Sequence, residues 1–157
     1  MNVPPLKRVY VDESGIDTYI YREKARAVRG KKVYGAVNGK KYKRTNIVAA
    51  KCGNEIFAPL EYTGSTDHRL FEQWFTTMLL PILALGSVII LDNASFHRKS
   101  VLKMLAKEAG FTIVFLPPYS PDYNLIEYFW ASLKSRLRKI IKDFDSLSDA
   151  ITACFQT

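Results

Sequence analysis

Apolar and polar residues alternate along the first part of the chain, in short runs separated by turn-forming residues. Residues 8–12 alternate and then stop at Glu13-Ser14-Gly15, which predicts a strand that ends in a tight turn. Consecutive strands joined by short turns form an antiparallel meander. Further strands are predicted at residues 18–22, 33–37, 45–51 and 55–62, with turns at Asn38-Gly39 and Gly53-Asn54.

The pattern changes to helical spacing after Ser65. Thr66 or Asp67 can cap a helix that runs to about residue 80, because apolar residues recur there at three- and four-residue steps. A meander followed by alternating helices and strands predicts an α/β fold, in which helices pack on a mixed sheet. The remaining elements are predicted as buried strands at 87–91 and 112–116, and helices at 99–108, from about 124, and at 146–155.

The segment at residues 116–133, LPPYSPDYNLIEYFWASL, joins the last predicted strand to the long helix. Pro117, Pro118 and Pro121 fix φ and lack an N–H, so they predict a rigid loop and exclude a strand or a helix interior. The helix that follows carries Glu127 near its first turn. The loop and the helix together therefore hold one carboxylate in a fixed place.

Three carboxylates fall at the ends of predicted elements. Asp12 closes the first strand, Asp92 is the first polar residue after the apolar run, and Glu127 opens the long helix. Functional groups gather at the carboxyl ends of strands in open α/β sheets, so neighbouring strands would bring Asp12 and Asp92 together. Close carboxylates repel one another, and hard divalent cations such as Mg²⁺ neutralise them. Two such ions about 4 Å apart would serve an in-line phosphoryl transfer.

Each of these acids also has a purely structural interpretation. Asp12 could start a turn, and Asp92 could form an Asx turn into the next helix. Glu127 could complete a capping box with Asn124 as the N-cap. Two rival acids lie in predicted turns and are interpreted as caps: Glu13 and Asp122.

The charge of the chain narrows the choice of partner. The 157 residues carry a net charge of +8, with a pI near 9.5. Residues 22–51 contain eleven Lys or Arg against one acid, and residues 134–142 contain five basic residues and no acid. This imbalance favours a polyanion, most commonly nucleic acid, although two solvated basic faces would produce it as well.

Other function classes are excluded by composition. The two cysteines, Cys52 and Cys154, lie far apart and have no CxxC spacing, which argues against a disulfide framework or a zinc site. The longest apolar run, residues 78–91, is broken by Pro81 and Gly86 and is too short to span a bilayer. The first residues show no secretory signal pattern. We therefore expect an intracellular protein that has no membrane partner.

Three blocks of the sequence carry a resemblance to a known family. VDESG at 11–15, LDNASFH at 91–97 and LPPYSPDYNLIEYFWASLK at 116–134 resemble the signature blocks of the DDE transposase catalytic domain. The resemblance is to the bacterial insertion-sequence branch of the mariner-like superfamily, the DDE superfamily endonucleases. The 34 residues between Asp92 and Glu127 fit the spacing of that branch. The resemblance implies an RNase H-like fold with a mixed five-stranded sheet, and two Mg²⁺ ions, with Mn²⁺ as a substitute, on Asp12, Asp92 and Glu127.

The resemblance also implies the reaction and the partners. Divalent-metal-dependent cleavage at the transposon ends would be followed by attack of the freed 3′-OH on target DNA. A homodimer is implied, because two ends must be joined. The matched blocks place Asn93, His97 and Asn124 where groups behind the metal ligands or against DNA would lie. We expect contacts to DNA phosphates from the two basic clusters, in particular from Arg26, Arg29, Lys31, Lys32, Lys134 and Arg138.

The chain departs from the family pattern at its start. The first predicted strand begins within ten residues of Met1. We therefore expect one catalytic domain over residues 1–157, without the helix-turn-helix region that reads transposon ends. The chain would be an excised domain, one frame of a split element or a remnant. A separate helix-turn-helix polypeptide would then read the ends, in the nucleoid-containing cytoplasm of a bacterium.

Two functions from other classes stay open on the sequence. A non-catalytic DNA-binding remnant, or a domesticated domain, would keep the fold and the basic face, but it would have no need of all three acids. A ribonuclease-H-type nuclease would use similar acids. The proline-rich loop and the 34-residue gap before Glu127 argue against this second alternative.

Overall fold

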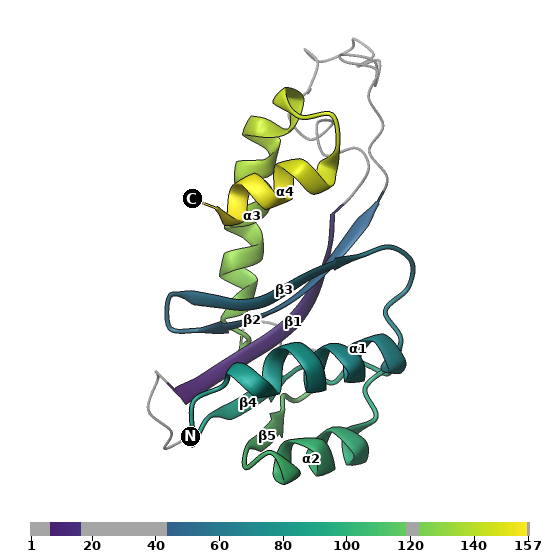
Figure 1. Cartoon of the computed structure of the whole chain (residues 1–157), viewed down its shortest axis with the longest axis vertical. Coiled ribbons are helices and arrows are strands. Elements are labelled where there is room, and N and C mark those ends of the chain that lie inside the picture. The colour runs from purple at the N-terminus through teal and green to yellow at the C-terminus, as the bar shows by residue number, and fades with distance from the viewer. Residues whose placement is uncertain (1–6, 17–43, 119–122, 157) are drawn as a thin grey trace.

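The computed structural model describes residues 7–16, 44–118 and 123–156 (Figure 1). The described strands are β1 (Arg8–Ile16), β2 (Thr45–Cys52), β3 (Glu55–Tyr62), β4 (Val88–Leu91) and β5 (Thr112–Phe115), and the α-helices are α1 (His68–Trp74), α2 (Lys99–Glu108), α3 (Ile126–Ile140) and α4 (Leu147–Phe155). The predicted strands at 18–22 and 33–37 lie outside these residues. In the described part of the chain, none of the helices has the length and apolarity needed to cross a membrane.

The strands form one mixed sheet in the order β3-β2-β1-β4-β5. β1, β2 and β3 are antiparallel neighbours, and the turn at Gly53-Asn54 joins the last two. β4 pairs with β1 in parallel, and β5 pairs with β4 in parallel. The predicted α/β fold, a meander followed by alternating helices and strands, is confirmed. Three parallel strands therefore end at the same edge of the sheet.

Two hydrophobic cores cover the two faces of this sheet. On the α1/α2 face, Val11 and Leu91 pack with Phe71 and Trp74 of α1. On the α3/α4 face, the core gathers Ile47 and Ala49 of β2 and the buried stripes of α3 and α4, which lie against one another (Figure 1). Successive residues of a strand point to opposite faces. Neighbouring side chains of β1 therefore enter different cores.

β1 is longer than the alternation predicted. It runs through Glu13-Ser14-Gly15 to Ile16, whereas a turn was predicted there. The extra residues pair with β2, and Gly15 lies opposite Asn46. A side chain at Gly15 would lie 2.7 Å from the Arg44 guanidinium and 3.1 Å from the Asn46 amide oxygen, so this glycine serves close approach within a strand. Long-range pairing outweighs the local turn preference of these residues.

The helices follow their predicted positions closely. α1 begins after Asp67, whose side chain accepts from the N–H of Leu70, and it continues as a π-helical segment at Phe75–Leu79 and a 3-10 turn at Leu80–Ile82. α4 is capped by Ser146 in the same way. Asp67 is one of the two caps considered for α1, and Asp and Ser side chains act as caps because they accept the free N–H groups of a first turn.

Candidate active site

The parallel register of the sheet places two of the predicted acids side by side. β1 and β4 pair with Val11 opposite Leu91, so Asp12 and Asp92 follow at the next position of each strand. Asp12 lies within β1, opposite Ala49 of β2, and is 7% exposed. Asp92 lies just past β4, and the N–H of Ala94 donates to its Oδ1 at 3.4 Å in an Asx turn. The prediction that Asp12 closes its strand is wrong, although it does lie where the pairing with β4 ends.

Glu127 reaches the same place from the first turn of α3. The start of α3 is tied to β1 by Asn124, whose buried amide donates to the carbonyl of Val11 at 3.1 Å and accepts from the N–H of Ile126 at 3.3 Å. Asn124 therefore positions the helix directly beside the strand that carries Asp12. Asn124 is not the N-cap, and the capping box considered for Glu127 is absent from this described turn, since the N-cap is Leu125 with no side-chain bond.

Asp12 is strongly perturbed by this environment. Burial raises its pKa from 3.8 to about 10, helped by a hydrogen bond with Glu127 and by the negative charges of Glu13, Glu127 and Asp92. Without a positive charge nearby, the Asp12 carboxyl therefore keeps its proton at neutral pH. A cation bound at this place would have to displace that proton, as metal ions do when they bind carboxylates.

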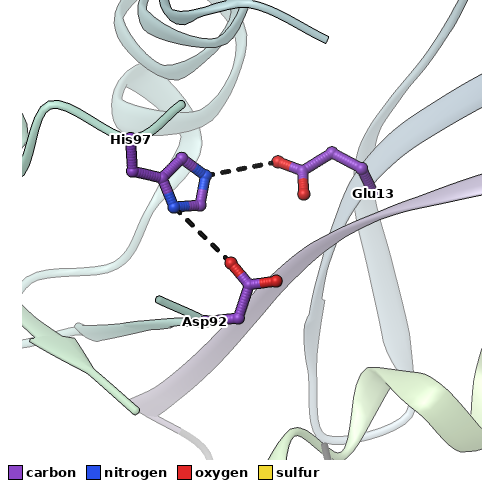
Figure 2. A group of neighbouring side chains, drawn as sticks. All are labelled: Glu13, Asp92 and His97. Carbon is purple, nitrogen blue, oxygen red and sulfur yellow. Dashed lines mark ion pairs between the residues drawn. The ribbon is translucent and has the colours of Figure 1, made fainter. Parts of the chain in front are cut away.

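A second group of side chains meets Asp92 from the α1/α2 face. His97, in the loop between β4 and α2, lies with Nδ1 3.5 Å from Asp92 Oδ1 and with Nε2 3.5 Å from Glu13 Oε1 (Figure 2). Glu13 follows Asp12 on β1 and points to the opposite face. Burial raises the pKa of Glu13, and the hydrogen bond and charge of His97 act in the other direction.

The predicted role of Glu13 as a cap is wrong. Glu13 lies inside β1 rather than in a turn, and its side chain is only 11% exposed. The alternation of Val9, Val11 and Glu13 along the strand could have revealed this, because the two valines already marked the inward face. Its partner His97 was singled out by its block, but nothing in the sequence paired the two.

The donor set suits hard divalent cations. Asp12 and Asp92 follow paired residues of neighbouring strands, and Glu127 and Asp92 both raise the pKa of Asp12. No described Lys or Arg is among the groups that shift this pKa. Mg²⁺ and Mn²⁺ prefer such oxygen ligands. Among the described residues, the group in which one ligand atom of each side chain lies within 4.8 Å of the others is Glu13, Asp92 and His97. The oxygen donors of Asp12, Asp92 and Glu127 are of the kind that a divalent cation takes, but among the described residues these three do not form a group as close as that of Glu13, Asp92 and His97.

Asn93 and the basic residues predicted to contact DNA lie in different parts of the chain. Asn93 lies beside Asp92, partly buried. Lys134 and Arg138 lie on α3, seven and eleven positions after Glu127, and these steps return to the same stripe of a helix with 3.6 residues per turn. The predicted phosphate contacts of the first basic cluster lie outside the described residues: Arg26, Arg29, Lys31 and Lys32.

Known proteins resemble this chain in sequence or in fold. The chain is 28% identical over 124 residues to an uncharacterized protein, y4pE/y4sA, of Sinorhizobium fredii, and the match covers 78% of each chain. The fold matches the Mos1 transposase paired-end complex with left transposon end, with a TM-score of 0.68, 16% identity, and coverage of 97% of this chain and 47% of that one. The Mos1 mariner paired end complex with Mn matches with a TM-score of 0.68, 16% identity, and coverage of 96% and 47%.

These likenesses confirm the RNase H-like fold, a mixed five-stranded sheet with flanking helices. The chain spans just under half the length of the solved transposase chains that it matches. The profile of one family, the DDE superfamily endonucleases, matches residues 7–148 and therefore includes Asp12, Asp92 and Glu127. The chain belongs to the family of DDE superfamily endonucleases.

Proposed function

We propose that this chain is the catalytic domain of a transposase, which cuts DNA at transposon ends in a divalent-metal-dependent reaction and transfers the freed 3′-OH into target DNA. The observation that supports the proposal is that Asp12 and Asp92 follow paired residues of neighbouring parallel strands, while Glu127 raises the pKa of Asp12 through a hydrogen bond and its charge. Membership in the endonuclease family and the likeness to Mos1 complexes support it.

Asp12, Asp92 and Glu127 would hold two divalent cations, Mg²⁺ or Mn²⁺ as its substitute. When bound, the cations supply activation of the attacking oxygen and neutralisation of charge on the phosphate. The protein contributes position. The strand pairing fixes Asp12, and the Asn124 bond to Val11 holds α3, and with it Glu127, against β1.

The substrate is held by charge. Lys134 lies on the same stripe of α3 as Glu127, about 10 Å further along at 1.5 Å per residue, and Arg138 lies one turn beyond. Cations at these positions would attract the phosphates of a DNA strand whose scissile bond lies at the acids. The partners in this proposal are transposon ends and target DNA, a second copy of the chain that joins two ends, and a separate helix-turn-helix polypeptide.

The proposal is tested by nicking of supercoiled plasmid in Mg²⁺ or Mn²⁺. We expect Asp92→Asn to lose nicking by at least about 10³-fold, because the phosphoryl transfer depends on metal positioning. DNA binding should survive or improve, because one negative charge near the phosphates is gone. Glu108→Gln, a charge change at the exposed end of α2, is the matched control and should nick like the parent.

Equal nicking by Asp92→Asn and the parent would refute the catalytic assignment. Absence of nicking in the parent, together with tight and salt-sensitive DNA binding, would favour the non-catalytic remnant. Addition of a helix-turn-helix partner would then separate a remnant from a domain that is idle without its end-binding component.

A further inference from the structure

The Asp92 carboxylate is held differently from that of Asp12. Asp12 is paired with Ala49 of β2, whereas Asp92 lies past the last paired residue of β4 and its side chain is 43% exposed. Two nitrogens approach its Oδ1: the N–H of Ala94 at 3.4 Å and Nδ1 of His97 at 3.5 Å. Contacts that converge on one oxygen leave the other, Oδ2, for a ligand.

The imidazole that approaches Asp92 is itself immobilised. The His97 side chain is 0% exposed and lies between aromatic rings, with ring-centroid distances of 4.5 Å to Phe71 and 4.3 Å to Phe96. Phe115 lies further off, at 6.5 Å. A ring packed on several sides keeps its plane, and its nitrogens therefore keep their directions.

The far side of the same ring is met by Glu13. Nε2 of His97 lies 3.5 Å from Glu13 Oε1, and Figure 2 shows the ring between the two carboxylates, with one nitrogen directed at each. Among the described residues, neither ring nitrogen has a hydrogen-bond partner, so the two carboxylates at 3.5 Å are the polar groups that face them. Glu13 is next to Asp12 on β1. The Glu13–His97 pair therefore connects the strand of one acid to the side chain of another.

His97 lies between the carboxylates of Asp92 and Glu13 and bridges them, rather than joining them as ligands of one metal ion. An imidazole binds a metal ion through one nitrogen, and the other ligands then surround the ion on the side of that nitrogen. Here each carboxylate faces a different nitrogen, on opposite sides of the ring (Figure 2). A ring that presents one nitrogen to each carboxylate is arranged to orient them.

We propose that His97 is a positioning residue for Asp92 and that Glu13 in turn fixes His97. This inference rests on the proposed function, because it assumes that Asp92 is a cation ligand. His97 donates from Nδ1 to Asp92 Oδ1 and keeps Oδ2 directed at the cation shared with Asp12. Glu13 holds Nε2 and so sets the orientation of the ring. Groups of this kind behind a metal ligand affect affinity by about 10- to 100-fold when they are lost.

Two substitutions of His97 test the roles of its two ring nitrogens separately. The amide nitrogen of Asn in His97→Asn takes the place of Nδ1, and that of Gln in His97→Gln takes the place of Nε2. We expect His97→Gln to weaken Mn²⁺ binding about 10- to 100-fold and His97→Asn to remain within about threefold of the parent. The measurement is a titration of the whole chain with MnCl₂, followed by the electron paramagnetic resonance signal of free Mn²⁺ at one fixed pH.

Three results would overturn the proposal. The first is parent-like affinity in both variants, and the second is an equal loss in both or a loss confined to His97→Asn. The third is a nitrogen coupling in the spin-echo spectrum of Mn²⁺ bound to the parent, which would make the imidazole a direct ligand. Should the His97 variants fail to fold by circular dichroism, the shape-preserving Glu13→Gln decides. We expect a several-fold loss of Mn²⁺ affinity, and unchanged affinity contradicts the proposal.

Asp92→Asn distinguishes this failure from failure of the proposed function. If Asp92→Asn binds Mn²⁺ as the parent does, the acid site itself is misassigned. If Asp92→Asn loses binding while His97→Gln retains it, the site stands and the positioning role of His97 is wrong.

Discussion

Asp12 and Glu13 are consecutive acids on one strand, and they differ in the groups that shift the pKa of each carboxyl. Asp12 points to the α3/α4 face, where it meets Glu127, and its pKa is raised to about 10. Glu13 points to the α1/α2 face, where burial raises its pKa but His97 stands beside it and opposes the rise. The side chain of His97 opposes the rise of the Glu13 pKa, whereas every described group that acts on the pKa of Asp12 raises it. Under the proposed function, a cation from outside the chain would offset the charge on the Asp12 side.

The largest expected effect that tests this comparison is the pH dependence of the free energy of unfolding, measured in EDTA. The carboxyl of Asp12 ionises near 3.8 in the unfolded chain but keeps its proton up to about 10 in the folded one. The folded state therefore binds more protons across that window, and the free energy of unfolding falls as pH rises through it, by up to about 1.4 kcal/mol per pH unit. The contribution of Asp12 is fully present below 3.8 and is lost above the folded pKa.

Asp12→Asn should flatten this slope and stabilise the metal-free protein on the order of 2–4 kcal/mol at pH 8, because an amide carries no proton to hold. Urea unfolding in EDTA at pH 5, 7 and 9 measures the effect. Glu13→Gln serves as the comparison and should change the slope less, since His97 already opposes the shift of its pKa. An unchanged slope in Asp12→Asn would contradict the assignment of the perturbed group.

A smaller effect on the free energy of unfolding is expected when a divalent cation is added. We expect Mg²⁺ or Mn²⁺ to stabilise the parent, by about 2.7 kcal/mol at a concentration one hundred times the dissociation constant. Because Asp12 holds a proton before the ion binds, binding at pH 7 should release about one proton. Calorimetric titration in buffers of different ionisation enthalpy measures that release. Asp12→Asn should release none from this position, while Glu108→Gln should behave like the parent.

The sequence predicted the sheet and the helices better than it predicted the neighbours of the acids. Asp92 and Glu127 were placed by local signals, an apolar strand that stops and a helix that begins after prolines. Register could not be read, so the strand-long pairing that keeps Glu13 out of a turn was missed. Local capping rules suggested a box for Asn124, yet its amide bonds the distant carbonyl of Val11. Contacts across 113 residues leave no periodic signal in a sequence.

The smallest expected effect concerns DNA affinity, compared between the two faces of the sheet. Lys134 lies on α3 in line with Glu127, whereas Lys107 lies at the exposed end of α2, on the other face. If DNA is bound along the α3 side, Lys134→Ala should weaken binding of a short duplex several-fold. It should also lower the slope of log affinity against log salt by about 0.9, the value of one lost phosphate contact.

Lys107→Ala removes the same charge from the net +8 of the chain but should leave the salt slope unchanged. Fluorescence anisotropy between roughly 50 and 200 mM salt resolves such a difference. Equal effects of the two substitutions would mean that DNA binding depends on net charge alone, and would contradict the proposal that Glu127, at the start of α3, faces the bound strand. A drop confined to Lys134→Ala places the phosphate backbone along the helix that carries Glu127.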